Sequence, residues 1–396
     1  MMAVSTRPNR GAAMLEIIIG KAMATIFLCA GQVPQNFRRS TMRLVVVLLA
    51  LVMIGAVGPL QANETQTAHG VVVLQYHHIG DDTPRVTSVT AAELEAHFAY
   101  LKEHDYNVVS LGEAQQLIAS GEVPDKLVAL TFDDGWRNVY DNGLEVFKRY
   151  RYPFTIFVNP ALMAETPRLY MTWEQLRELE SYGAQIANHS NSHAHMTWRR
   201  DGESEAQWLA RQEHDILAAQ QALEEGMGSA QPRFFAYPYG EYNPALAELL
   251  IEHDFVAFGQ HSGPWGTHSP LAQVPRFPAS AQYADLKTLA TKIASLPLPV
   301  RSVEPKNMVL GHEQNSVEIR FAAIIEDFRA AQMNCFYQGQ QFQPEWQDEE
   351  AYFTVEDIPV GRSRVNCTVP SLSESGRFYW YSVPLVRPNA QGRWPD

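Results

Sequence analysis

The chain has 396 residues, of which 46% are hydrophobic and 19% charged, with 24 glycines and 24 prolines. This composition excludes a disordered, collagen-like or coiled-coil protein, and the length is enough for two domains with a substantial core. The 31 Lys and Arg against 44 Asp and Glu give a formal charge of −13. That charge disfavours electrostatic capture of nucleic acid or of anionic membranes, so we expect no nucleic-acid partner.

The first distinctive segment has the pattern of an export signal. Three arginines within residues 38–43 precede an unbroken apolar run at 44–57, and a small residue follows at Ala62. The pattern predicts a signal peptide cleaved near Ala62, and hence a periplasmic or extracellular protein. A signal anchor in the inner membrane is less favoured, because the run is shorter than the ~20 residues of a spanning helix. Residues 1–62 are therefore excluded from the fold, and Met42 is an alternative start of translation.

Between residues 70 and 298, short β-branched runs alternate with helical patterns. We expect strands at 71–76, 107–111, 126–132, 154–158, 185–188, 234–237 and 255–258, and helices at 91–103, 113–120, 138–150, 172–182, 203–225, 244–253 and 285–294. This alternation is typical of βα units around a parallel sheet, either a (β/α) barrel or an open doubly wound sheet. Both architectures place active sites at the carboxyl ends of the strands.

Beyond about residue 300 the pattern becomes alternating and aromatic, which indicates a small all-β, sandwich-like domain. We expect strands at 317–321, 333–337, 351–355, 363–369 and 377–383, and a helix at 324–332. The paired prolines of 296–299 indicate a linker between a catalytic domain at 63–298 and a β-rich accessory domain at 300–396. The aromatic residues 379–381 either bind glycan or fill the core of that accessory domain.

Two cysteines, Cys335 and Cys367, lie in the expected accessory domain. In an oxidising compartment they can form a disulfide, and two free buried thiols are the alternative.

Reactive side chains gather at the expected carboxyl ends of strands. Asp133 and Asp134 follow one strand, and His189 and His193 follow another. Two imidazoles and one carboxylate are a ligand set of catalytic zinc sites, and the second carboxylate can then act as a base. Alone, an Asp-Asp-Gly sequence is usually a turn and an HxxxH spacing is usually solvated. Their common placement favours a metal site, whose histidines would share a face if their loop begins a helical turn.

With these motifs, residues 70–295 resemble the NodB-homology polysaccharide deacetylases, whose fold is a distorted (β/α) barrel. Thr-Phe-Asp-Asp-Gly at 131–135 matches the first family motif, His-Ser-x-x-His at 189–193 the second, and Tyr-Pro-Tyr-Gly at 237–240 the third. The Tyr-His pair at 76–77 resembles the branch that includes periplasmic poly-N-acetylglucosamine deacetylases.

The resemblance implies a role for each motif residue. Asp133 is implied as the catalytic base, and the backbone N–H of Tyr239 as a donor to the oxyanion. The implied metal ligands are Asp134, His189 and His193.

The sequence departs from the family pattern at two places. The arginine that usually opens the third motif is replaced by Ala236, and we expect Arg276 to orient Asp133 instead, a surface arginine being the alternative. The proton donor to the leaving amine is open: we favour His77, with its neighbour His78 as an alternative. His312 has the letters of the family's Leu-x-His motif but lies in the β-rich region.

These features predict a metal-dependent hydrolase that removes N-acetyl groups from an N-acetylglucosamine-containing polysaccharide. Zinc is the expected metal, with Co²⁺, Ni²⁺ or Fe²⁺ as alternatives. The competing functions are an O-acetyl polysaccharide esterase that uses the same site and a non-catalytic glycan-binding protein. Candidate sugar-stacking residues and site-lining amides are Trp136, Tyr170, Trp173, Trp265, Tyr283, Asn159 and Asn188.

Overall fold

The computed structural model describes residues 69–395, so the predicted signal segment lies outside the described residues. From Thr65 onward the chain forms one compact unit, and the domain boundary that we expect before residue 300 stays a prediction. Within 69–395, none of the helices combines the length and the apolar character needed to cross a bilayer.

Eight strands of the described part form one parallel sheet. Its order is β10 (Phe277–Pro278), β1 (Val71–Tyr76), β5 (Leu127–Phe132), β6 (Phe154–Val158), β7 (Ala184–Asn188), β8 (Phe234–Ala236) and β9 (Val256–Phe258), with β4 (Asn107–Val108) beside β5. The two ends of this order meet, because Val274 bridges Phe258 of β9 while Phe277 of β10 pairs with Leu74 of β1. The sheet is thus a distorted (β/α) barrel, which confirms the predicted fold class.

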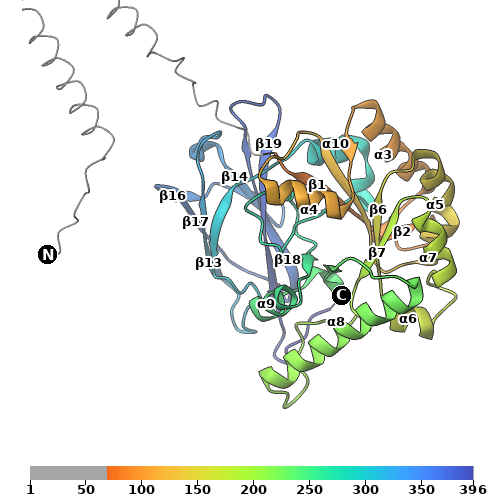
Figure 1. Cartoon of the computed structure of the whole chain (residues 1–396). Coiled ribbons are helices and arrows are strands. Elements are labelled where there is room, and N and C mark those ends of the chain that lie inside the picture. Colours follow the sequence, from red (N-terminus) through yellow and green to blue (C-terminus); the bar gives the residue numbers. More distant parts are fainter. Residues whose placement is uncertain (1–68, 396) are drawn as a thin grey trace, which may run out of the picture. The chain divides into compact units, whose positions relative to one another are not determined.

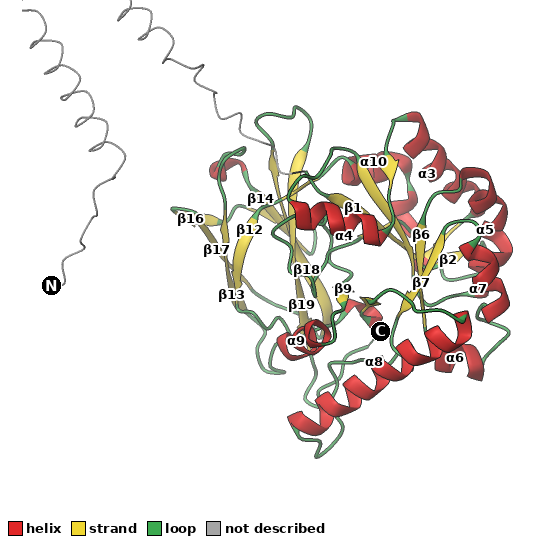
Figure 2. Ribbon diagram, viewed as in Figure 1, coloured by secondary structure: helices red, strands yellow, loops and turns green. Residues whose placement is uncertain are grey.

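Helices cover the outside of these strands, as α3, α5 and α7 show in Figure 2. The helices are α3 (Ala91–Glu103), α4 (Leu111–Ser120), α5 (Arg137–Tyr150), α6 (Pro160–Glu165), α7 (Trp173–Glu180), α8 (Glu205–Met227), α9 (Pro244–Glu252) and α10 (Leu286–Ile293). Only the short α6 was not predicted. Four of them, α3, α4, α7 and α8, begin with a capping box, in which a Ser or Thr and a Glu or Gln three residues later satisfy each other's backbone N–H groups.

The strands of the barrel are buried on both faces, and their alternation decides what points inward. Val71 and Val73 of β1 and Ala129 of β5 pack in the interior cluster with Phe157. Continuing the period of two places Gln75 and the residue after β5, Asp133, on the same inner face. The barrel interior is therefore apolar over most of its depth and polar at the carboxyl end of the strands.

Two sheets, antiparallel except for the β11–β19 pair, make up the all-β C-terminal part, seen in the blue range of Figure 1. One contains β11 (Leu296–Pro297), β19 (Phe378–Arg387), β18 (Gly361–Pro370), β14 (Asn334–Tyr337) and β15 (Gln340–Phe342). The other contains β12 (Val300–Glu304), β13 (Val317–Ala323), β17 (Glu350–Val355) and β16 (Glu345–Gln347). Short β2 (His78–Ile79) and β3 (Ser88–Val89) pair in a loop of the barrel. Cys335 of β14 and Cys367 of β18 face each other and form a disulfide.

The segment 296–299, which we interpret as the linker, contains β11, which is buried and pairs in parallel with β19. One expectation for this part was wrong. The expected helix at 324–332 is a loop that ends in a single 3-10 turn, Ala330–Gln332. The segment is not helical because Asp327 bonds to distant residues. Its buried carboxylate accepts hydrogen bonds from Ser371, Ser373 and Tyr379 and so anchors the loop to the strands around it.

Candidate active site

Asp133 and Arg276 form a buried ion pair at the polar end of the barrel. The Arg276 guanidinium donates to both carboxylate oxygens, over 2.7 and 2.8 Å, and neither side chain is exposed to solvent. Arg276 reaches the interior because it lies between Val274 and Phe277, in the short segment that completes the ring of strands. The arginine that we expected to replace the motif arginine at Ala236 therefore does contact Asp133.

Further hydrogen bonds fix both partners of this pair. Gln75 donates to Asp133 Oδ2 over 2.7 Å. Arg276 also donates to the carbonyl of Gly259 and to the Thr131 hydroxyl, and Thr131 in turn donates to a carbonyl of β1. Burial alone would raise the pKa of Asp133, but the charge of Arg276 lowers it below its usual value. The carboxylate is therefore ionised and held in one orientation at neutral pH.

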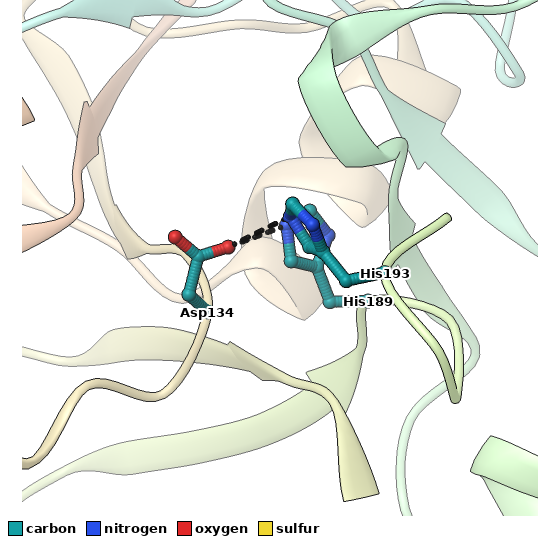
Figure 3. Close-up of side chains that lie close together, drawn as sticks. All are labelled: Asp134, His189 and His193. Carbon is teal, nitrogen blue, oxygen red and sulfur yellow. Dashed lines mark ion pairs between the residues drawn. The ribbon is translucent and has the colours of Figure 1, made fainter. Parts of the chain in front are cut away.

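Asp134, His189 and His193 converge beside this pair (Figure 3). Asp134 Oδ1 lies 3.1 Å from Nε2 of each histidine. The other carboxylate oxygen accepts a hydrogen bond from the indole of Trp136 over 2.7 Å. The His189 Nδ1 lies 2.7 Å from the carbonyl of Ala236. The backbone of Ala236 thus orients the His189 imidazole although its side chain departs from the family pattern.

The chemistry of this donor set fits a divalent cation. Because a carbonyl oxygen accepts hydrogen bonds, His189 carries its proton on Nδ1 and turns the lone pair of Nε2 toward Asp134. Asp134 Oδ1 is buried and has no hydrogen-bond partner. Burial alone would lower the pKa of His189, but Asp134 and Asp133 raise it. The facing acceptors attract positive charge, and two imidazoles with one carboxylate match the ligands of a catalytic zinc site.

The loops that carry these residues have backbone conformations that L-residues rarely adopt. The φ angles of Asp134, Ser190, His193 and Tyr239 are all positive, between 52° and 72°. Such strain gathers at functional sites. The loop at 189–193 does not begin a helical turn: it is irregular, and Ser190 Oγ accepts the backbone N–H of His193 over 2.9 Å.

Of the remaining predicted residues, some lie close to Asp133, Asp134 and the two histidines, and others do not. Tyr239 lies beside the triad, with its ring centroid 4.8 Å from that of His193. His77 Nε2 is 3.8 Å from Asp133 Oδ2, whereas the His78 ring packs at a tilt of 32° against Trp136, with centroids 4.5 Å apart. The His312 side chain is half-exposed and pairs with the neighbouring Glu313, so the structure does not bring it into this cluster.

Of the predicted amides and aromatic residues, some lie at the site and others are part of the core. Asn159 donates to the carbonyls of His189 and Ser190 and so holds the loop between the two histidines. Trp136 stacks on Tyr170 at 4.7 Å next to Asp134. Trp265 is fully buried, and its backbone pairs with Val71. It therefore cannot stack on a sugar.

Sequence reasoning missed two polar residues of the site, Gln75 and Glu241. Gln75 could have been found, because it is the only polar residue in the run Val71–Tyr76 and falls on the inward phase of the strand. Glu241 follows the third motif directly, yet nothing in its neighbourhood indicates that its carboxylate is buried.

Part of the chain is similar to known deacetylases. Residues 120–258 match the family model described as polysaccharide deacetylase. Poly-beta-1,6-N-acetyl-D-glucosamine N-deacetylase of Escherichia coli K12 is 25% identical over 274 residues, which are 60% of this chain and 40% of that protein. The chain thus spans less than half the length of this relative.

Two solved structures share the fold. Streptococcus pyogenes deacetylase PplD in complex with acetate aligns with a TM-score of 0.52 at 19% identity, over 57% of this chain and 99% of that chain. IcaB from Ammonifex degensii aligns with a TM-score of 0.50 at 24% identity, over 57% and 98%. In its motifs, in its barrel and over residues 120–258, the chain is similar to the polysaccharide deacetylases.

Proposed function

We propose that the protein is a divalent-metal-dependent deacetylase that removes N-acetyl groups from an exported or cell-envelope polysaccharide containing N-acetylglucosamine. The observation that carries this proposal is the pairing of two carboxylates with different surroundings. Asp133 is locked by Arg276, while its neighbour Asp134 faces two imidazole nitrogens. The adjacent residues therefore suit different roles, one as base and one as ligand. Export is supported by the apolar run at 44–57 behind a basic segment.

The metal would be held by Asp134, His189 and His193, and zinc suits these ligands best. When bound, such a cation polarises the acetyl carbonyl and acidifies a water molecule. Asp133 then accepts the proton of the attacking water, and the Arg276 contact keeps its carboxylate aimed into the site. The backbone N–H of Tyr239 is assigned to the oxyanion, a contact that is worth about 2.7–4 kcal/mol in other hydrolases.

The leaving amine needs a proton, and His77 is the group that we assign to this step. Its Nε2 lies 3.8 Å from the Asp133 carboxylate that collects the proton from water. Because 3.8 Å exceeds the length of a hydrogen bond, a proton gained by Asp133 would reach the imidazole through one bridging water and then pass to the amine. An ester would not need this step, because an alkoxide is a better leaving group than an amine anion.

The test is acetate release from N-acetylglucosamine oligomers by residues 63–396, stripped of metal by a chelator and then reloaded with zinc. We expect release to stop with the chelator, to return with zinc, and to be absent in Asp133→Asn. Glu313→Gln is the matched control and should retain full activity. The Glu313 carboxylate pairs with His312, far from these residues in the sequence.

The other outcomes select the competing functions. Release from acetylated xylan but not from the oligomers would identify an O-acetyl esterase. Zinc and oligomer binding without any acetate release would identify a glycan-binding protein. Release that resists the chelator would contradict the metal assignment.

A further inference from the structure

The C-terminal β-rich part reaches the loop of the third motif through two side chains. Arg362 of β18 and Trp394, which follows β19, both donate to Oε1 of Glu241, over 3.4 and 2.5 Å. Glu241 lies two residues after Tyr239 and is 1% exposed. Burying a carboxylate is costly unless it accepts hydrogen bonds, and here two of the donors come from residues more than 120 positions further along the chain.

The same carboxylate anchors a stack of rings that ends on Tyr239. Glu241 Oε2 lies 2.9 Å from Nδ1 of His195. The His195 ring stacks on Tyr239 at 3.9 Å and on Trp198 at 3.8 Å, with interplanar angles of 7° and 10°. The orientation of the Tyr239 side chain is therefore coupled through His195 to the position of Glu241.

Residues of the C-terminal part also contact both ends of this stack. The Arg362 guanidinium lies 5.2 Å from the Tyr239 ring centroid, and that of Arg393 lies 4.8 Å from the Trp198 ring. Trp394 meets Trp198 edge-on at 5.4 Å. A cation over an aromatic face and an edge-to-face ring pair are both favourable arrangements. Tyr239, whose φ is 59°, is thus held in a strained conformation by contacts from outside the barrel.

We propose that Arg362 and Trp394 are positioning residues of the active site, which fix the Tyr239 backbone through Glu241 and His195. This inference rests on the proposed function, because it assigns a purpose to the Tyr239 N–H. It gives the C-terminal part a role beyond attachment to the barrel: without its two donors, Oε1 of the buried Glu241 would lose its partners.

The experiment compares Trp394→Phe, Arg362→Met and Arg362→Lys with wild type. Trp346→Phe is the control for a lost indole, since Trp346 of β16 packs on Phe321 and Phe328 within the C-terminal part. Arg320→Met is the control for a lost guanidinium, because Arg320 pairs with Glu318 on β13. Three quantities are measured: kcat and KM on N-acetylglucosamine oligomers, the Kd of zinc, and the Kd of a methylphosphonamidate analogue of the N-acetyl group.

We expect Trp394→Phe and Arg362→Met to lower kcat by about 10- to 100-fold, the usual cost of misplacing a catalytic group by about 1 Å. The affinity for the tetrahedral analogue should fall by the same factor, while KM and zinc affinity stay unchanged. Arg362→Lys should recover part of the loss, because it restores the cation. Both controls should behave like wild type.

Unchanged kcat and analogue affinity in both variants would overturn the inference. So would a rise in KM alone, which indicates a substrate contact, or a loss of zinc affinity, which indicates damage to the metal loops. A wild-type protein that neither releases acetate nor binds the analogue would instead refute the proposed function itself.

Discussion

At the scale of single residues, Asp133 and Arg276 form a fully buried ion pair in the site. Both side chains are fully buried, and the two hydrogen bonds between them are bidentate. Removing one partner of such a pair leaves the other as an unpaired charge in a medium of low dielectric constant. A substitution in this pair is therefore expected to change both stability and activity.

We expect Arg276→Met to lower the free energy of unfolding by about 3–5 kcal/mol, measured by urea unfolding of the metal-free protein. The double variant Asp133→Asn/Arg276→Met should recover part of this loss, because it leaves no charge unpaired. A double variant as unstable as the sum of the two single variants would show that the two residues do not stabilise each other.

A second residue-scale prediction concerns Asp327, which lies far from the metal site in the sequence. Burial alone would raise its pKa, but hydrogen bonds from Ser371, Ser373 and Tyr379 lower it below the usual value. A depressed pKa in the folded state stabilises the protein above the unfolded pKa of about 3.9, and this contribution disappears as the pH falls through the folded value.

Asp327→Asn should therefore cost about 1–3 kcal/mol at neutral pH, the scale of lost hydrogen bonds to a charged group. The Tm difference from wild type should be constant between pH 5 and about pH 8 and should shrink below about pH 4. The measurement is thermal unfolding across that range. A difference that grows toward low pH would contradict the assigned direction.

At the scale of elements, the turn between β5 and α5 directs two adjacent side chains to different partners. Asp133 contacts Arg276, and Asp134 lies beside His189 and His193. Gly135 has φ of 70°, and a Cβ there would lie 2.8 Å from Cγ1 of Val158 on the neighbouring strand. Only glycine meets both conditions. The glycine of the first motif is thus explained by packing against β6.

Gly135→Ala should lower stability by about 1–3 kcal/mol, the cost of a residue held in a sparsely populated conformation. Zinc affinity, measured by isothermal titration, should fall with it because Asp134 moves with the turn. Gly112→Ala is the control: this helical glycine has only the Ser110 hydroxyl 4.0 Å from an added Cβ. If Gly135→Ala retained full zinc affinity, the turn would not determine the position of Asp134.

Many of the strands and the positions of the motif residues could be predicted from the sequence. Strand phase and β-branched runs located β1, β5, β6 and β7, and the motif letters located the carboxylates and histidines at their ends. Arg276 was identified because the missing charge at Ala236 required a substitute. These signals are local, or they follow from the requirement that Asp133 be paired.

What failed depends on contacts between distant segments. The 324–332 segment has a helical pattern, yet Asp327 finds its partners in residues 371–379. The paired prolines at 296–299 indicate a linker but give no sign that Leu296 pairs with Tyr379 of β19. The contact of Trp394 with Glu241 spans 153 positions and has no signature in the sequence. Such pairings become visible only when the chain is folded.

At the scale of the whole molecule, the barrel and the C-terminal sheets contact each other at several places. Trp380 of β19 packs edge-on against Phe277 of β10, with ring centroids 5.1 Å apart. Arg377 donates to Asp125 of the barrel over 2.8 Å and to the carbonyl of Ala294 over 2.7 Å. The β11–β19 pairing adds backbone hydrogen bonds. We therefore expect one cooperative unfolding transition of residues 63–396.

The disulfide provides the test, because it lies only in the antiparallel sheet. Cys335 and Cys367 are 32 positions apart, and closing a loop of that length in the unfolded chain stabilises the folded state by about 3–4 kcal/mol. The double variant Cys335→Ala/Cys367→Ala should lower the midpoint of a single transition that far-UV circular dichroism and tryptophan fluorescence report alike. Its zinc affinity in the folded state should equal that of wild type, since no ligand lies in that sheet. Two separate transitions, of which only one moves, would mean that the barrel folds without the sheets. The contacts of Arg362 and Trp394 with Glu241 would then join two independently stable parts.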